Sequence, residues 1–214
     1  MKTVTIDIVS DVVCPWCIIG YRRLQVALEQ LKAEVTADIQ FHPFELNPSM
    51  PTGGQNLSEH LIEKYGTTPQ QSRETRDMIT NTGKELGFSF NFSHDMRMYN
   101  TRKAHQLLLW AGDFEKQADL KLAMFSAYFT DNVCIEDNNA LLDIVESVGL
   151  DRNKAIKVIE SSEWAKEVEA IETQWTNAGI QGVPAYIINK KHLITGAQEP
   201  ETLAQAIKEI SDLG

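Results

Sequence analysis

The chain has few cysteines, no long apolar run and no excess of basic residues. Three cysteines among 214 residues are too few for a disulfide scaffold. No segment approaches the apolar length that a membrane span needs. The formal net charge of −10 makes nucleic acid and anionic membrane surfaces poor partners, because both attract basic patches. We therefore expect a protein that binds neither nucleic acid nor membranes.

What remains is an ordinary globular composition, with 43% hydrophobic and 23% charged residues and no internal repeat. The length suits one large domain, or one domain with a sizeable insertion. Residues 1–9 alternate like a strand and lack the small-residue cleavage site of a signal peptide. The sequence therefore predicts a cytoplasmic protein.

The first 45 residues predict a strand–helix–strand unit. Residues 3–9 alternate like a strand, and residues 35–45 predict a second one. Apolar residues at helical spacing between them predict a helix from about Pro15 to Leu31. Pro15 suits a first helical turn, where its missing N–H would have no intrahelical partner. This order is a βαβ unit.

A long helical block separates this unit from the next strands. Residues 46–57 are rich in Pro and Gly and predict a loop. Helical patterns follow from Ser58, near 70–86, and over 101–110, 114–130, 138–148 and 152–178. Strand patterns return at 185–188 and 192–195 as a hairpin, and a last helix runs from Pro200 to Ile210.

The order predicts an α/β fold of the thioredoxin-like kind, βαβ then ββα, with a large all-helical insertion between the halves. We expect residues 1–46 and 178–214 to form the thioredoxin-like domain. Residues 57–177 would form the insertion, and its last helix, about 152–177, could pack with the thioredoxin core.

The motif Cys14-Pro15-Trp16-Cys17 carries the chemistry that this order suggests. Cysteines three apart at a helix start lie one turn apart, close enough to bridge. At the helix N-terminus, free N–H groups and the dipole favour the Cys14 thiolate, which is the form that attacks disulfides. Cys17, deeper in the helix, would be the resolving thiol. Trp16 cannot stabilise a thiolate by charge as a histidine would, so we expect a less oxidising disulfide.

Two other interpretations of the cysteine pair stay open. A structural zinc site needs four ligands, and only Cys134 and five scattered histidines remain to complete one. A purely structural pair is the other alternative. Redox chemistry is favoured because the motif lies in a βαβ unit, and we expect neither a metal nor a bound cofactor.

A second candidate segment, Gly182-Val183-Pro184, directly precedes the predicted hairpin. From these residues alone, two interpretations are equally good. The Val183–Pro184 bond is either cis and shapes a loop, or trans at the start of an edge strand.

Several segments together resemble the DsbA-like thioredoxin superfamily and, within it, the FrnE-type cytoplasmic branch. They span nearly the whole chain. The segments are residues 10–17 with Ile19-Gly20, Phe44-Glu45-Leu46-Asn47-Pro48, residues 100–105, Gly182-Val183-Pro184 and Gly196-Ala197-Gln198.

The resemblance implies disulfide oxidoreductase activity and a cis bond before Pro184. It implies that Pro15, Trp16, Val183 and Pro184 contact a thiol- or disulfide-bearing protein or small molecule. The Val183 backbone could pair with an extended substrate segment. The resemblance further implies glutathione as a thiol or disulfide partner. It also implies a homodimer formed through the helical block.

Residues of the helical block are weaker candidates for the site. His105 could lie near the thiols as a proton donor or substrate contact. The alternative is a buried, hydrogen-bonded histidine behind a helix cap at Asn100 or Thr101.

Acids before the motif are also candidates. If buried, Asp11 or Asp7 could accept the Cys17 proton. We favour an exposed loop acid or a capping residue for Asp11, because short acids are common there. Cys134 is expected to be a small buried apolar residue.

Three functions compete at this stage. Dithiol–disulfide exchange is favoured. A glutathione-dependent isomerase or transferase, of the related 2-hydroxychromene-2-carboxylate isomerase and kappa class, is the first alternative; in that class serine is the pattern where this chain has Cys14. The second alternative is a non-redox peptide-binding or chaperone-like module, which would use an apolar groove over Cys14 lined from segments 107–110 and 124–129.

Overall fold

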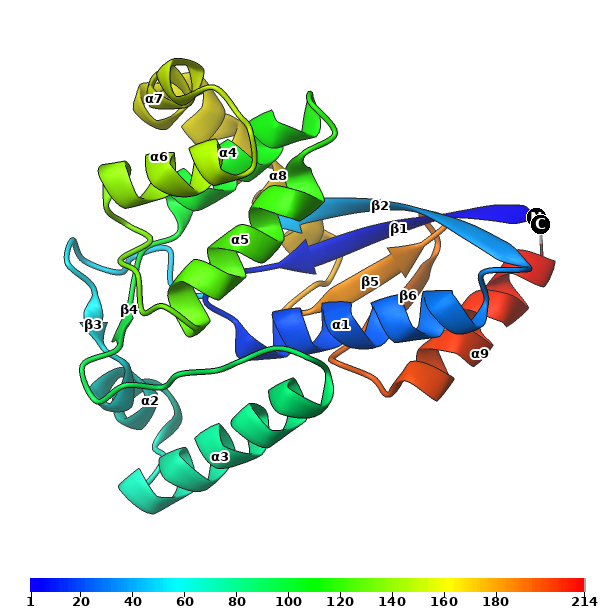
Figure 1. Cartoon of the computed structure of the whole chain (residues 1–214), viewed down its shortest axis with the longest axis horizontal. Helices are drawn as coiled ribbons and strands as arrows, with labels where there is room; N and C mark the ends of the chain where they lie inside the picture. Colours follow the sequence, from blue (N-terminus) through cyan, green and yellow to red (C-terminus); the bar gives the residue numbers. More distant parts are fainter. Residues whose placement is uncertain (214) are drawn as a thin grey trace.

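A computed structural model describes residues 1–213 and shows a four-stranded sheet of order β2-β1-β5-β6 (Figure 1). Strand β1 (Lys2–Ser10) runs parallel to β2 (Val35–Pro43), and α1 (Pro15–Gln30) connects them. Strand β5 (Ala185–Ile188) pairs antiparallel with β1, and β6 (His192–Thr195) pairs antiparallel with β5. The predicted thioredoxin-like fold, βαβ and then ββα, is thereby confirmed.

One face of the sheet is covered by α1 and α9 (Pro200–Asp212), which lie side by side in Figure 1. Val4, Ile6 and Ile8 alternate along β1 and pack into this core, as the period of two along a strand requires. On the other face, Trp175 of α8 (Ser162–Asn177) packs on His42, with ring centroids 4.9 Å apart.

The remaining elements lie between β2 and β5 in sequence. They are β3 (Gln55–Asn56), α2 (Leu57–Tyr65), α3 (Pro69–Glu85), β4 (Arg97–Met98), α4 (Arg102–Gly112), α5 (Gln117–Phe129), α6 (Asn138–Ser147), α7 (Arg152–Glu160) and α8. Strands β3 and β4 pair antiparallel and were not predicted, because two residues carry no periodicity. Within residues 1–213, none of the helices has the length and apolar character to cross a membrane.

The prediction of one helix over 152–178 is wrong, because Ser161 divides it into α7 and α8. Ser161 has an extended backbone, with φ −78° and ψ 122°, and its hydroxyl accepts hydrogen bonds from the N–H groups of Glu163 and Trp164. A serine that caps the next helix in this way stops the preceding one. The segment that reaches β2 of the thioredoxin sheet is therefore α8.

The helical block encloses one end of the sheet. Helices α4, α5 and α8 contact β2, and both α3 and α5 contact α1. In Figure 1 the first turn of α1 lies between α5 on one side and α3 on the other. The predicted strand over 35–45 ends at Pro43, so Phe44 to Pro48 form a loop at the same end.

Candidate active site at the start of helix α1

Cys14 is the N-cap residue of α1, with φ −93° and ψ 111°, and Pro15 follows it in the first turn. The Cys17 N–H donates a hydrogen bond to the Cys14 carbonyl oxygen at 3.1 Å. Both thiols are free and buried, with 4% and 2% of each residue exposed. The Cys14 Sγ lies 3.7 Å from the Val183 carbonyl oxygen. The tertiary fold thus brings the two segments singled out in the sequence into contact.

The Val183–Pro184 bond is cis in this structure. Pro184 is buried, and Gly20 of α1 leaves the room for it. A Cβ atom at Gly20 would stand 2.1 Å from the Tyr186 hydroxyl oxygen and 3.1 Å from the Pro184 Cγ. Gly20 is therefore needed for the close approach of the Val183 loop and β5 to the first turns of α1.

The surroundings of the Cys17 thiol disfavour its thiolate form. Burial raises the pKa of the Cys17 thiol well above its ordinary value, and its hydrogen bond to Cys14 raises it further. Lys121 and a backbone group of Asp11 act in the opposite direction. Cys17 therefore holds its proton, and it needs a proton acceptor before it can form a thiolate.

Asp11 is fully buried, so the favoured interpretation as an exposed or capping acid is wrong. Its Oδ2 accepts the Leu46 N–H at 2.8 Å, and its Oδ1 lies 3.2 Å from the His105 Nε2. Burial raises the pKa of Asp11, but His105, the Leu46 amide and Lys121 together hold it below its usual range. The loop after β2 and helix α4 close over this carboxylate, which no local pattern could indicate.

His105 is buried at the bond with Asp11, with 1% of the residue exposed. Asn100 Oδ1 accepts the Arg102 N–H at 3.0 Å, so Asn100 bonds the first turn of α4. Thr101 holds the N-cap position without a side-chain bond. Asp7 lies on the α8 side of the sheet, 2.7 Å from the His42 Nε2. Of these candidates, His105 is the one joined to the motif through Asp11.

Lys121 of α5 was missed at the sequence level. Its Nζ donates a hydrogen bond to the Ser10 carbonyl oxygen at 3.3 Å and lies over the rings of Phe41 and Phe125, and 1% of the residue is exposed. Burial lowers the pKa of Lys121 to about 8, although Cys17, Asp11 and Cys14 each act to raise it. A signal was present: Lys121 falls on the buried helical stripe that contains Leu120, Met124, Phe125 and Tyr128.

Tyr186 was also missed. Its hydroxyl is buried, has no hydrogen-bond partner among residues 1–213, and burial with the charges of Cys17 and Cys14 raises its pKa. Cys134, by contrast, is half-buried rather than buried, which corrects its assignment as a core residue. Burial and a hydrogen bond to Cys134 raise the pKa of Tyr99 to about 12.

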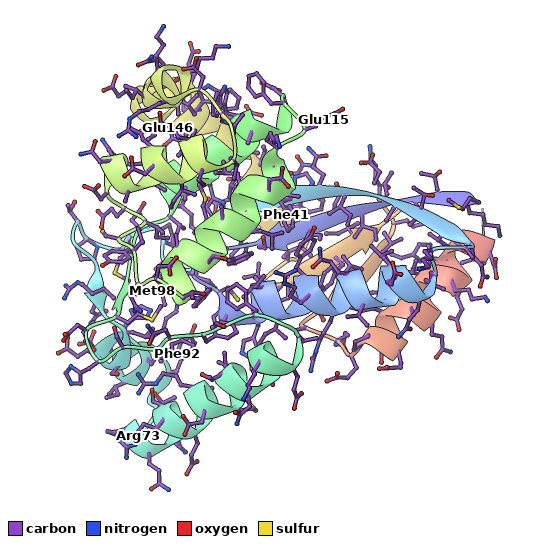
Figure 2. The ribbon with its side chains drawn as sticks, viewed as in Figure 1. Phe41, Arg73, Phe92, Met98, Glu115 and Glu146 are labelled. Atoms are coloured by element: carbon purple, nitrogen blue, oxygen red, sulfur yellow. The ribbon has the colours of Figure 1, made fainter. Side chains whose placement is uncertain are left out.

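A cavity of about 390 Å³ opens on Cys14. Pro15, Trp16 and Val183 line it beside the thiol, so these predicted contact residues face one space. Pro184 does not line it. Its other walls come from the loop after β2, from α2 and α3, and from α5. Most lining side chains are apolar: besides Pro15, Trp16 and Val183, they are Val13, Leu46, Leu57, Leu61, Ile79, Phe92, Met98 and Phe129. Figure 2 shows Phe92 and Met98 in the space between α3 and α5.

The described part of the chain contains no group of three or more His, Cys, Asp or Glu side chains arranged to hold a metal. The polar groups around the thiols are instead a carboxylate, an imidazole, an ammonium and a phenol. Such a set can stabilise thiolates and move protons.

Comparisons with known proteins agree with this geometry. An uncharacterized Bacillus subtilis protein, YwbO, is 26% identical over 208 residues, which cover 97% of each chain. The crystal structure of a probable DsbA oxidoreductase from Streptomyces coelicolor superposes with a TM-score of 0.89 at 26% identity, over 96% of this chain and 89% of that one. The fold is shared at 15% identity with the cytosolic disulfide reductase DsbM from Pseudomonas aeruginosa, with a TM-score of 0.67 over 98% and 100% of the chains. Residues 5–208 match the DSBA-like thioredoxin domain, and the chain therefore belongs to this family of proteins.

Proposed function

We propose that this protein catalyses dithiol–disulfide exchange, with Cys14 as the nucleophile and Cys17 as the resolving thiol. One observation carries the proposal: Cys14 caps α1 beside the free Cys17 and lies 3.7 Å from the Val183 carbonyl oxygen. A thiolate at a helix N-terminus, next to a second thiol and to the backbone of the Val183 loop, suits attack on a disulfide.

The exchange balances as follows. The Cys14 thiolate attacks one sulfur of a disulfide, the substrate S–S bond breaks, and the first thiolate leaves. Cys17 then loses its proton and attacks the Cys14 sulfur, which releases the second thiolate. The protein is oxidised to the Cys14–Cys17 disulfide and the substrate is reduced to two thiols. The reverse sequence oxidises a dithiol substrate.

Lys121 is proposed to accept the Cys17 proton. Its charge acts on Cys17, and a pKa of about 8 leaves part of the population neutral near physiological pH. Asp11 is a poorer acceptor because its pKa is held low, so it serves as a fixed negative charge. His105 then acts as a positioning residue that holds this carboxylate.

The alternatives make different demands on the cysteines. A glutathione-dependent isomerase or transferase needs Cys14 alone, whereas the buried Cys17 beside it favours exchange. A non-redox binding module needs neither thiol. We also propose membership of the FrnE-type branch, and a cytoplasmic location, where free thiols such as these persist.

Thiol release tests the proposal. Reduced protein carrying Cys134→Ala, which leaves only the two motif thiols, is mixed with the neutral aromatic disulfide dithiodipyridine. We expect two thiopyridones per chain and an internal disulfide identified by mass spectrometry. Cys17→Ala should stop at a mixed disulfide on Cys14 with one thiopyridone released, and Cys14→Ser should lose the fast phase. Fast reaction that survives in Cys14→Ser would disprove the assignment.

A further inference from the structure

The cavity on Cys14 has an unusual charge for this chain. The sequence contains 30 acidic residues and has a net charge of −10. None of the residues that line the cavity is Asp or Glu, and its one lining arginine or lysine is Arg76 of α3. A cavity with a cation and no acid, on an acidic protein, complements an anionic ligand.

Arg76 is held in place without being neutralised. Its Nε donates a hydrogen bond to the Ser72 carbonyl oxygen at 3.2 Å, and its Nη1 donates to the Ser58 Oγ at 3.4 Å. In residues 1–213 it makes no ion pair with a carboxylate. The histidine in the wall is His60, whose Nδ1 lies 2.9 Å from Gln55 Oε1. Burial lowers the pKa of His60, which leaves Arg76 as the fixed charge.

A second polar group, close to Arg76 on α3, lacks a hydrogen-bond partner in the described chain. Ser72 lies one turn before Arg76 on α3 and lines the cavity, and its hydroxyl is buried with no hydrogen-bond partner in the described chain. A buried hydroxyl is rarely left unpaired in proteins. A donor hydroxyl next to a guanidinium can serve the two oxygens of a carboxylate.

The size and access of the cavity restrict the ligand further. A volume of about 390 Å³ is that of a small-molecule site. Cys14 is only 4% exposed at its floor, which leaves little access for a folded protein surface. The apolar wall between Cys14 and α3 suits an aromatic or aliphatic body. Tyr65 lines this wall, where burial raises its pKa and the nearby charge of Cys14 raises it further.

We infer that the Cys14 cavity takes a small disulfide with an apolar body and a carboxylate, and that Arg76 and Ser72 bind the carboxylate while the Cys14 thiolate attacks a disulfide sulfur and the substrate S–S bond breaks. In the reverse direction, a thiol of the same class attacks Cys14 of the internal disulfide, and Cys17 leaves as the thiolate. This inference rests on the proposed exchange function and names its substrate class. It assigns to Arg76 a role in specificity that the thiol chemistry does not require.

A pair of aromatic disulfides tests it. Dithiobis(nitrobenzoate) carries carboxylates, whereas dithiodipyridine is a smaller, neutral aromatic disulfide. Second-order rate constants for Cys14 are measured by stopped flow for the parent protein, Arg76→Gln and Arg73→Gln. Arg73 is the matched control, because it lies one turn away on α3, lines a neighbouring cavity rather than this one, and its loss changes the net charge equally. Figure 2 shows Arg73 at the outer end of α3.

We expect Arg76→Gln to slow the anionic probe at least tenfold and the neutral probe less than twofold. Arg73→Gln should slow neither probe more than twofold, and Arg76→Lys should keep most of the rate with the anionic probe. Equal slowing of the anionic probe by both glutamine variants would show a long-range field and overturn the subsite. Equal slowing of both probes by Arg76→Gln would show altered packing and overturn it as well.

The two proposals fail in distinguishable ways. Suppose that dithiodipyridine oxidises the parent to the internal disulfide but Arg76→Gln leaves the rate constant with the anionic probe unchanged. The exchange function is then supported and the carboxylate site at Arg76 and Ser72 is disproved. If neither probe yields a Cys14–Cys17 disulfide, both the exchange function and the carboxylate site are disproved. An unfolded protein disulfide that reacts faster than dithiobis(nitrobenzoate) would overturn the small-molecule assignment alone.

Discussion

The Nζ of Lys121 lies 3.3 Å from the Ser10 carbonyl oxygen and brings a buried ammonium group to the Cys14–Cys17 motif from the inserted helix α5. Its charge acts on Cys17, Asp11 and Cys14. The helical insertion thus supplies part of the active-site electrostatics as well as the cover of the cavity.

Replacing Lys121 with methionine should stabilise the protein and slow exchange. A pKa lowered from 10.5 to about 8 means that folding at neutral pH works against a charged amine, by roughly 3 kcal/mol at 1.36 kcal/mol per unit. This penalty is full below pH 8 and vanishes above pH 10.5, so the gain in unfolding free energy should shrink across that window. Urea unfolding at pH 7 and pH 10 measures it.

The same substitution should remove the proton acceptor for Cys17. We expect the second step, measured as release of the second thiopyridone, to slow about a hundredfold or more, the lower end of the usual range for general bases. Methionine keeps the apolar contacts of the lysine stem, so a variant that is both less stable and equally fast would contradict both assignments of Lys121.

The substitution Asp11→Asn should lower the free energy of unfolding at neutral pH, and this difference from the parent should shrink in acid. The folded pKa of Asp11 lies below its ordinary 3.8, so its contribution is present above that value and is lost as the pH falls through the folded pKa. Loss of a buried charge-assisted network costs about 1–3 kcal/mol. Chemical denaturation at pH 7 and at pH 3 should show the difference between variant and parent shrinking at the lower pH; an equal difference at both would refute the assignment.

Trp16→His should make the disulfide more oxidising. An imidazolium beside Cys14 stabilises the thiolate and therefore the reduced form, which raises the reduction potential. We expect a rise of about 30 mV or more, equivalent to roughly 1.4 kcal/mol for two electrons. Equilibration in glutathione redox buffers, with thiol trapping and mass spectrometry, measures both potentials. A parent potential as high as about −120 mV would contradict the expected role of Trp16.

Gly20→Ala should be destabilising although alanine favours helices. The added Cβ would stand 2.1 Å from the Tyr186 hydroxyl oxygen, so the buried ring or the helix must shift, at a cost of about 1–3 kcal/mol. Gly182→Ala is the matched control, because a Cβ there meets nothing within 4 Å. Adding Tyr186→Phe to Gly20→Ala should recover part of the lost stability. Thermal unfolding of the parent, the two alanine variants and the double variant measures these effects. Equal melting temperatures for the two alanine variants would rule the contact out.

Local patterns were sufficient for much of the fold. The strand 185–188, the hairpin partner 192–195 and the start of α1 at Pro15 were predicted because alternation, a short turn and a first-turn proline act within a few residues. The single helix over 152–178 failed for the opposite reason. Ser161 can cap a helix or lie within one, and its surroundings decide which.

The candidate site, like the fold, has a part that local sequence predicts and a part that it does not. The sequence by itself determined the candidate cysteine pair, because a Cys14–Cys17 spacing at a helix start is a local property of the chain. Only the tertiary structure decided what surrounds the pair. Asp11 is buried because Leu46 and His105 close over it, and Lys121 reaches the motif from α5, more than 100 residues away. Burial and electrostatics depend on distance in space, so they arise only when the helical insertion packs against the first turn of α1.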